Sequence, residues 1–419
     1  MLGFVTSTQP TKNCYKETVI IRATVEEKIK LSSRIKTIAT LLLGITLVAI
    51  LTACETRSPV KAQKRVFLDL SLEFLGEYQL PKTSFKNTQV GGLSALTYDR
   101  LSQRFYALSD DRDKARFYTL NPTLTTTAEG EVVLENMEVE DVTFLRDEKG
   151  ATYAQGTVDP EGIAVSPQGT VFISSEGVAS KGIAPFVKEF DLKTGKGKQS
   201  LRIPQRFLPN VPGKDSGEPR GVRDNLGFEG LTLADVGLAK TDPFRLFTAT
   251  ESSLAQDSST EEEEPAIQPP VRLLHYQINP VGQPILVAEH LYLLDVAPSD
   301  VIYNGVTELM ALNEAGYFLS LERTFGFSGH GAKIFQIAMG NATDTSNIAS
   351  LKNNLSTIQP LRKKLILDLR ELGIPLDNLE GMTFGPPLPD GSQSLILVSD
   401  DNFRKNQVTQ FLLFKISFN

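Results

Sequence analysis

Acidic residues recur along this 419-residue chain next to short apolar segments. One series stands at the start of such segments, at Glu161, Glu229, Glu308 and Glu380, and a second stands at the end of the following segments, at Asp110, Asp111, Glu176, Glu251, Glu322, Asp400 and Asp401. Gathered at one site, these carboxylates would repel one another and favour a bound cation such as Ca²⁺, which takes six to eight oxygen ligands. A cation held there could polarise an ester and activate water.

Arginines follow several of these acids closely, at Arg112, Arg323 and Arg404. The guanidinium group matches the oxygens of phosphates and carboxylates, so we predict that these arginines bind an anionic, oxygen-rich substrate. The predicted metal ligands are Glu161, Glu229, Glu322, Glu380, Asp400 and Asp401. Among them we predict catalytic roles for Glu322, Asp400 and Asp401.

A structural role is the alternative for the same residues. A glutamate before a glycine turn can accept backbone N–H bonds and brace the repeat, and the arginines can simply pair with the neighbouring acids. Motifs of zinc proteases, serine hydrolases and P-loop enzymes are absent from the sequence. Of the three histidines, only His330, in a predicted loop after Arg323, is a candidate for function, whereas His275 is expected to pack within a strand.

The acids belong to a sequence motif that occurs five times, and successive copies of the motif begin about 70 residues apart. Each copy predicts an apolar hairpin followed by two further strands, and residues 162–174 show the hairpin most clearly. The start of one hairpin strand lies beside the end of the other, so the acids should gather on one rim.

The two ends of the chain complete this pattern. The last repeat lacks a fourth strand, and the segment 66–78 has no hairpin of its own. Pairing them closes a ring without exposed sheet edges. We therefore predict an all-β β-propeller of four-stranded blades, five in number, with a sixth inside the insertions at 203–224 and 255–270 left open. A β-sandwich would not explain the repeat.

The N-terminal region indicates export. A basic flank and an apolar run end at Leu51-Thr52-Ala53-Cys54, which resembles a bacterial lipobox. We predict an N-terminal extension and lipoprotein signal peptide at 1–53, a tether at 54–65 lipidated on Cys54, and a propeller at 66–419. The alternative is a plain transmembrane anchor. Residues 1–33 are unusual for a signal, and we expect the true start near Val25 or Leu31.

Composition limits the partners. The formal net charge of -7 argues against a nucleic-acid backbone as ligand. After cleavage only Cys54 remains, which excludes an internal disulfide and a cysteine-based metal site. We expect a monomer at the bacterial cell envelope, anchored by its lipid on the outer membrane or periplasmic face if the cell has two membranes.

Several phrases resemble the phytase-like propeller family, usually labelled "esterase-like activity of phytase". They are Asn225-Leu-Gly-Phe-Glu229-Gly230, Leu321-Glu322-Arg323, Asn378-Leu-Glu380-Gly381 and Val398-Ser-Asp400-Asp401-Asn402. The similarity spans about residues 91–418 and implies a calcium-dependent hydrolase with an acidic channel mouth. Our hypothesis is a cation-dependent hydrolase of phosphoesters or carboxylesters. Two alternatives stay open: a non-catalytic binding propeller at the cell envelope, and a lactone hydrolase.

Overall fold

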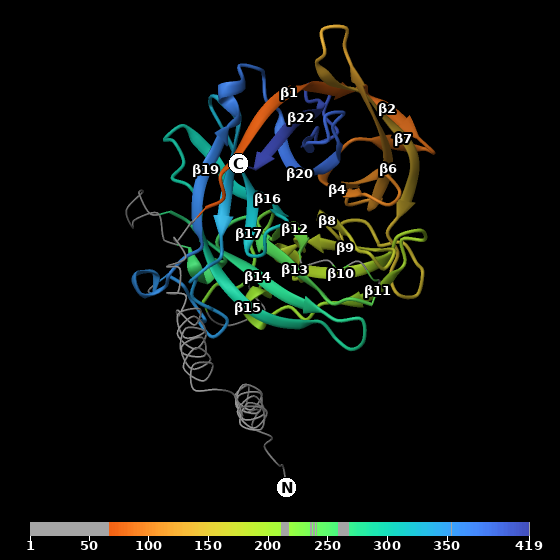
Figure 1. Cartoon of the computed structure of the whole chain (residues 1–419). Helices are drawn as coiled ribbons and strands as arrows, with labels where there is room; N and C mark the ends of the chain where they lie inside the picture. The colour runs from red at the N-terminus through yellow and green to blue at the C-terminus, as the bar shows by residue number, and fades with distance from the viewer. Residues whose placement is uncertain are drawn as a thin grey trace, which may run out of the picture. The chain divides into compact units, whose positions relative to one another are not determined.

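Five four-stranded sheets form a ring in the described part of the chain (Figure 1). The structure is a computed structural model that describes residues 67–210, 218–234, 237, 239, 241–258, 268–352 and 354–418. They belong to one compact unit, Val66–Asn419. The predictions for Cys54, for the tether and for the middle of the 255–270 insertion lie outside the described residues.

The sheets are the blades of a propeller. Blade 1 consists of β4 (Leu93–Asp99), β5 (Arg104–Ser109), β6 (Arg116–Thr126) and β7 (Val132–Phe144), and blade 2 of β8 (Pro160–Val165), β9 (Thr170–Ser175), β10 (Phe186–Asp191) and β11 (Gly197–Ser200). Blade 3 consists of β12 (Phe228–Ala234), β13 (Phe244–Thr250), β14 (Pro270–Ile278) and β15 (Ile285–Leu293), and blade 4 of β16 (Val301–Ala311), β17 (Tyr317–Gly326), β18 (Gly329–Ala338) and β19 (Arg362–Asp368). Blade 5 consists of β20 (Asn378–Pro387), β21 (Gln393–Asp400), β22 (Thr409–Phe418) and β1 (Leu70–Leu80).

The first strand of each repeat lies innermost. The innermost strands contact one another in the order β4, β8, β12, β16 and β20, and β20 returns to β4 (Figure 1). This ring confirms the predicted β-propeller. The described residues form five blades and no sixth.

The N-terminal strand closes the ring, as the sequence predicted. β1 pairs antiparallel with β22, from Leu70 opposite Phe418 to Leu80 opposite Thr409. In Figure 1 the orange β1 runs beside the dark blue β22. Both ends of the chain therefore share one blade, in which β1 is the outermost strand and covers the edge of β22.

The hydrophobic core lies between neighbouring blades. In β21, Leu395 and Leu397 pack toward blade 4, whereas Ile396 and Val398 pack toward blade 1. A sheet that is buried on both faces needs an apolar residue at nearly every position, which explains the unbroken apolar run of this strand. Burial on both faces fixes the blades relative to one another.

Glycines of the repeated Glu-Gly phrase let the innermost strands approach closely. A Cβ atom on Gly230 would lie 2.5 Å from the backbone nitrogen of Leu309 in the next blade. A Cβ atom on Gly162 would lie 2.4 Å from the carbonyl oxygen of Glu229. The phrase is thus a packing requirement of the ring as well as a source of carboxylates.

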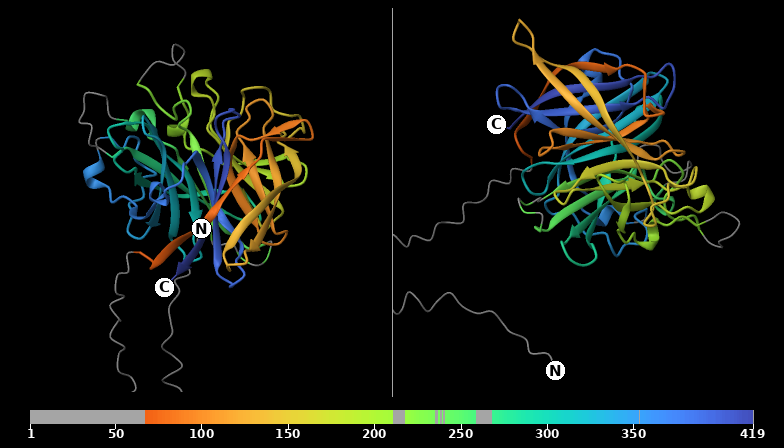
Figure 2. Two further views of the ribbon diagram at one scale, coloured as in Figure 1. Left: turned by 90° about the horizontal axis from the view of Figure 1, so that it is seen from above. Right: turned by 90° about the vertical axis from the view of Figure 1, so that its right-hand side faces the viewer.

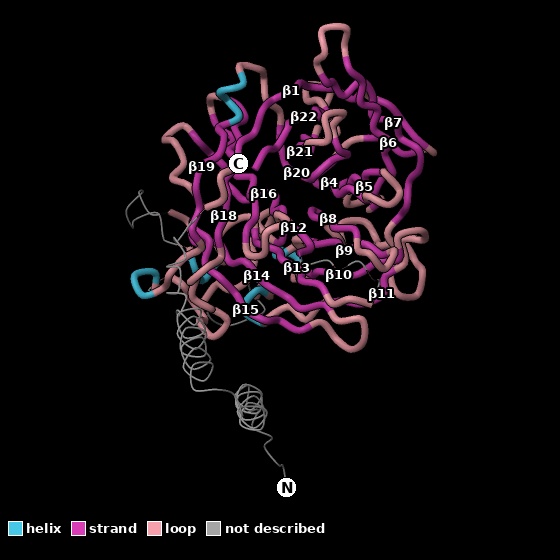
Figure 3. The backbone as a smooth tube through the Cα atoms, viewed as in Figure 1, coloured by secondary structure: helices cyan, strands magenta, loops and turns pink. Residues whose placement is uncertain are grey.

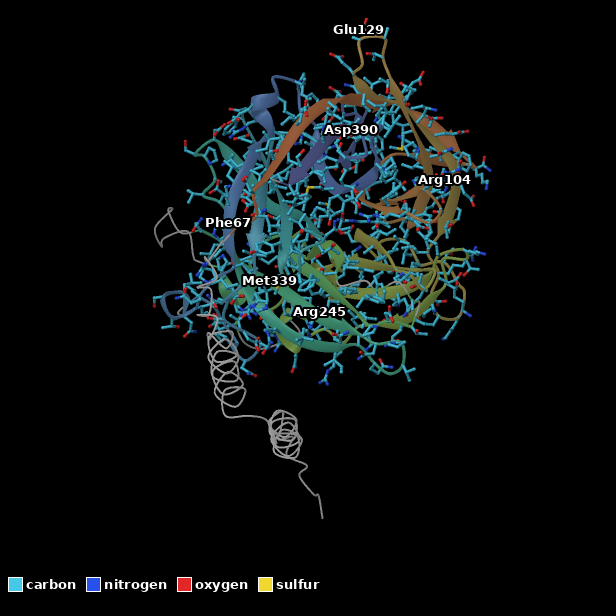
Figure 4. All side chains as sticks on the ribbon, viewed as in Figure 1. Phe67, Arg104, Glu129, Arg245, Met339 and Asp390 are labelled. Carbon is cyan, nitrogen blue, oxygen red and sulfur yellow. The ribbon has the colours of Figure 1, made fainter. Side chains whose placement is uncertain are left out.

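Elements outside the blades are small. The hairpin of β2 (Thr83–Phe85) and β3 (Thr88–Val90) follows β1, and the turn of the β6–β7 hairpin, marked by Glu129, projects beyond the other blades (Figures 2 and 4). Helical turns are short (Figure 3): η1 (Ala179–Lys181), η2 (Gln205–Phe207), η3 (Ala255–Asp257), η4 (Leu355–Thr357) and η5 (Leu369–Leu372). Across the described ranges, no helix has the length and apolar character needed to cross a membrane.

His330 lies in a strand, which corrects the predicted loop. β17 and β18 pair as far as Gly326 opposite Gly329, so only a two-residue turn separates them. Gly329, directly after the turn, has a φ of 87°, a conformation that glycine adopts without strain. His330 is therefore part of a paired strand of blade 4.

Candidate functional site

Carboxylates from four blades converge at one end of the central channel. This acidic cluster consists of Asp110, Asp159, Glu161, Glu176, Glu229, Glu251, Glu380 and Asp400. All except the partly buried Asp110 are buried. Blade 4 contributes no acid to the cluster; it contributes Arg323 instead.

Strand pairing explains the convergence. Phe228 pairs with Thr250, which places the following residues Glu229 and Glu251 at the same end of blade 3. Asn378 pairs with Asp400 in blade 5 in the same way. Because the five hairpins radiate from one axis, residues far apart in sequence meet at one end of the channel.

Two overlapping groups of acids have the geometry of a cation site. The carboxylate oxygens of Asp159, Glu161 and Glu176 lie within 4.8 Å of one another, and those of Glu176, Glu229 and Glu251 do so as well. Glu176 belongs to both groups. Buried side chains that offer only oxygen atoms suit a hard cation such as Ca²⁺.

Two arginines flank the acidic cluster. Arg112 donates to Asp159 at 2.6 Å and is 44% exposed, so part of its guanidinium faces solvent. Arg323 is more buried and donates to Glu251 at 2.6 Å and to Glu380 at 2.8 Å. These pairs offset part of the negative charge, but eight carboxylates exceed two guanidinium groups. The site therefore remains strongly acidic.

Burial and mutual repulsion raise the pKa values of the cluster. Burial, with a contribution from Asp400, raises the pKa of Glu380 to about 8 against the pull of Arg323. Burial also raises the pKa of Asp400 to about 6. The pKa values of Asp110, Glu161, Glu176 and Glu229 rise well above the usual range for the same reason. A bound cation would offset this cost of burial.

A cavity lies at the opposite end of the channel. It has a volume of about 450 Å³ and is lined mainly by apolar side chains at the carboxyl ends of the innermost strands, including Leu233, Leu312 and Phe384. Its described lining contains no carboxylate, histidine or cysteine. Titratable groups converge at the acidic end instead, which makes that end the candidate functional site.

Comparison with known proteins gives one family. The family described as "Phytase-like: Esterase-like activity of phytase" matches residues 88–403. The chain belongs to this phytase-like family. None of the curated proteins matches it.

Solved structures share only the general architecture of this phytase-like propeller. A thermostable family-43 glycoside hydrolase aligns with 9% identity and a TM-score of 0.43, over 82% of this chain and 93% of its own. The endo-arabinase from Bacteroides thetaiotaomicron VPI-5482 aligns with 10% identity and a TM-score of 0.39, over 79% and 95%. The N-terminal domain of Nup159 aligns with 10% identity and a TM-score of 0.34, over 84% and 97%. Similarity at this level carries no functional argument.

The structure brings together most of the residues that the sequence singled out in this phytase-like chain. Glu161, Glu229, Glu380 and Asp400 lie in the acidic cluster, and Arg112 and Arg323 flank it. Arg404, a predicted substrate-binding residue, is exposed on the loop after β21, and the described contacts involve its backbone only.

Asp401, predicted as a catalytic and metal-binding residue, has a structural environment instead. Its Oδ1 accepts the N–H groups of Gly92 at 2.9 Å and Phe403 at 3.0 Å. Its Oδ2 is paired with Lys82. These bonds join blade 5 to the turn before β4, so Asp401 braces the closure of the ring.

Glu322 does not face the acidic cluster, which corrects its predicted catalytic and metal-binding roles. Its carboxylate accepts from Tyr292 and Lys363 and from the N–H of Asp295 at 2.9 Å. β13 ends at Thr250, whereas β17 continues to Gly326, so side chains keep alternating between the two faces. Alternation turns Glu322 outward and Arg323 toward the cluster.

Glu308 has the structural role that was the alternative prediction for the repeat glutamates: it braces the repeat by accepting backbone N–H bonds. Its Oε1 accepts the N–H groups of Leu231 at 3.1 Å and Leu309 at 2.9 Å. The N–H of Met382 also bonds this carboxylate. One buried side chain thus ties together the innermost strands of three blades.

Sequence reasoning missed Asp159 and Asn378 and left Glu176 and Glu251 out of the predicted ligands. Asp159 and Asn378 each stand two residues before a repeat glutamate, at Glu161 and Glu380. Asn378 accepts from Arg323 at 2.6 Å and donates to Glu380 at 2.8 Å. Period-two alternation along the strand was the signal that could have found them.

Proposed function

We propose that this protein is an exported, lipid-anchored hydrolase of phosphoesters or carboxylesters that depends on a cation, with Ca²⁺ the first choice. One observation carries the proposal: two groups of three buried carboxylates share Glu176 and stand beside arginines from two different blades. Membership of the family described as "Esterase-like activity of phytase" supports the same chemistry.

The donor set fits a hard cation. Glu161, Glu176, Glu229 and Glu251 would hold it, together with Asp159. The buried Oδ1 of Asp110 also has no hydrogen-bond partner among the described residues. Bound there, a cation would supply polarisation of the substrate oxygen and a lowered pKa of water.

The remaining side chains of the site would bind the substrate, exchange protons and position the acids. Arg112, with its partly exposed guanidinium, is placed to bind an anionic group of the substrate. Glu380 and Asp400, with pKa values of about 8 and about 6, can each exchange a proton near neutral pH. Arg323 holds Glu251 and Glu380 in position.

The test uses residues 55–419, the mature chain without the cysteine that is predicted to carry the lipid. Melting temperature is measured with Ca²⁺ and with a chelator, followed by assays of p-nitrophenyl phosphate, p-nitrophenyl acetate and a simple lactone. We expect Ca²⁺ to raise the melting temperature, because a ligand of the folded state stabilises it by mass action. We expect turnover of one of the two p-nitrophenyl esters, and chelation should abolish it.

Glu176→Gln is the decisive variant, and Glu322→Gln is its matched control. Both replace a buried glutamate, but only Glu176 belongs to the acidic cluster. Glu176→Gln should lose the Ca²⁺ shift and lower turnover at least a hundredfold, while Glu322→Gln keeps both. Equal behaviour of the two variants would contradict the proposal. A Ca²⁺ shift without turnover of any ester would favour the binding propeller, and turnover of the lactone alone would favour the lactone hydrolase.

A further inference from the structure

At the acidic end of the channel, blade 4 extends further than its neighbours. The second strands of blades 3 and 5 end at Thr250 and Asp400, next to the acids of the cluster. β17 instead continues past Arg323 to Gly326, and both β16 and β18 pair with it over this extension. The extension therefore projects past the acidic cluster, at the mouth of the proposed active site.

Three aromatic side chains lie next to one another on this extension. Tyr303 of β16 pairs with Phe325 of β17, which pairs in turn with His330 of β18. The ring centroids of Phe325 and His330 lie 4.7 Å apart. Tyr303 is 61% exposed and Phe325 is 36% exposed. We refer to these three residues as the aromatic row; large apolar side chains left exposed as a group mark a surface that binds something.

The aromatic row lies on the same face of the sheet as Arg323. Gly305 pairs with Arg323 two residues inward from the row, so alternation of side chains places both rows on one face. A Cβ atom on Gly305 would lie 2.4 Å from the side chain of Glu251, an acid of the cluster. At about 3.4 Å per residue, the aromatic row stands roughly 7 Å beyond Arg323 along the strands. A ligand that reaches the acidic cluster can therefore contact the row as well.

Open space lies beside the aromatic row. His330 lines a cavity of about 390 Å³, which Asp377 and Asn406 of blade 5 also line. The residue after Asp377, Asn378, accepts a bond from Arg323 at 2.6 Å, so this cavity adjoins the acidic cluster. Ligand pockets commonly span roughly 300–1,000 Å³, which leaves room here for a ring of the substrate.

The chemistry of the row selects a flat, apolar group. Aromatic rings attract another ring through offset stacking or edge contacts, beyond the effect of buried area alone. Phe325, at the centre of the row, offers no hydrogen-bonding group, whereas the hydroxyls of a sugar or polyol would each need a partner on losing water. An aromatic ring therefore fits the row better than a sugar does.

We propose that the aromatic row binds a ring in the alcohol part of the substrate, so that the preferred substrates are esters of aromatic alcohols. The ester group then lies at the acidic cluster, and the ring packs on Tyr303 and Phe325. This inference rests on the hydrolase function proposed above and adds the class of substrate.

Benzylphosphonate and methylphosphonate test the row by binding alone, because neither contains an ester and the two differ only in the phenyl ring. Residues 55–419, labelled with ¹⁵N-histidine, are titrated with each compound in the presence of Ca²⁺. We expect benzylphosphonate to bind at least tenfold more tightly and to shift the ring signals of His330, which contacts Phe325. His275 and His290, in blade 3, should not shift. Equal affinities overturn the proposal, as does tighter binding of benzylphosphonate that leaves the His330 signals in place.

Variants connect the preference to the row. Tyr303→Ala and Phe325→Ala replace exposed side chains, and each should reduce the advantage of benzylphosphonate at least threefold. The double variant should abolish it. Phe327→Ala is the matched control, because Phe327 is 88% exposed but lies in the turn beyond the paired strands. A preference that survives in the double variant, or is lost equally in the control, refutes the site.

The results separate this inference from the hydrolase proposal. Glu176→Gln should weaken both phosphonates to a similar degree, because it alters the acidic cluster and leaves the aromatic row intact. The expected preference without turnover of any ester would contradict the hydrolase and retain the aromatic site. Turnover without the preference would refute the aromatic site alone. Absence of binding by both phosphonates overturns the aromatic site as well.

Discussion

At the scale of the residue, one side-chain type performs three different tasks in this propeller. Glu229 stands in the acidic cluster, Glu308 accepts backbone N–H bonds from three blades, and Glu322 pairs with Lys363 on the other face of its sheet. Glu229 and Glu308 both lie on an innermost strand, but Leu309 follows Glu308 where Gly230 follows Glu229. Glu322 lies in β17 next to Arg323, and each step of one residue along a strand turns a side chain to the opposite face.

Stability without metal should fall between about pH 7 and about pH 9. The folded pKa of Glu380, about 8, lies above the ordinary glutamate value of about 4.3, so the folded chain binds this proton more tightly than the unfolded chain. That contribution to stability is complete below about pH 4.3 and is lost as pH rises through 8. Histidines do not interfere, because they are neutral above about pH 7 in both states.

Melting curves of the mature chain in chelator, recorded at the two pH values, measure this effect. The stabilisation by Ca²⁺ should be larger at the higher pH, because the carboxylates must lose their protons to bind a cation. A metal-free melting temperature that stays constant or rises toward pH 9 would contradict the raised pKa values.

At the scale of the element, close packing of the innermost strands explains why glycine follows the repeat glutamate. Gly162 and Gly230 each face the backbone of the next blade at a distance that excludes a side chain. The glutamate of each Glu-Gly pair therefore supplies a carboxylate, and the glycine lets the neighbouring blade approach closely.

Gly230→Ala is expected to destabilise the propeller by about 1–3 kcal/mol, the usual cost of forcing an extra methyl group into a packed interior. The added Cβ would lie 2.5 Å from the nitrogen of Leu309. Gly340→Ala is the control, since a Cβ there meets no atom within 4 Å. Urea denaturation of both variants measures the difference, and an equal free energy of unfolding would disprove the packing argument.

The pairing of β1 with β22 predicts the effect of shortening the chain. A chain that begins at Lys82 lacks β1 and leaves β22 as an exposed edge, which invites pairing with other molecules. We expect this chain to aggregate or to elute as oligomers in size-exclusion chromatography, while a chain that begins at Val66 elutes as a single monodisperse species. A monodisperse, folded chain without β1 would show that closure is dispensable.

At the scale of the whole molecule, the acidic cluster and the N-terminal entry lie at opposite ends of the propeller. β1 begins at Leu70 opposite Phe418 and reaches the end that carries Asp400 only at Leu80. The described chain therefore enters the propeller at the end away from the acidic cluster.

Cys54→Ser is expected to release the protein from the membrane fraction, because thiol acylation is no longer available. The melting temperature of the propeller should not change, since Cys54 precedes its first strand, β1 (Leu70–Leu80). Cell fractionation and mass spectrometry of the N-terminus measure both lipidation and its loss. Equal membrane association of the variant would refute the lipoprotein prediction.

Fold and site differ in how far the sequence by itself determined them. Five repeats of one motif predicted five blades and left a sixth open, and the unmatched strand at each end of the chain predicted the closure by β1 and β22. The closure follows from the tendency of sheets to cover unpaired strand edges. The convergence of Glu161, Glu229, Glu380 and Asp400 followed from the same geometry.

Only the tertiary structure decided which repeat acids share a site. In the structure Glu322 points away from the acidic cluster and Arg323 contacts it instead. Asp159 is also part of the cluster. The tertiary structure placed His330 and Asp377, from different repeats, around one cavity. The physical reason is that β17 continues past the position at which β13 ends, and alternation along the strand sets the face on which each side chain lies. The repeated motif contains the residues that all five copies share, whereas the composition of the site depends on positions at which the copies differ.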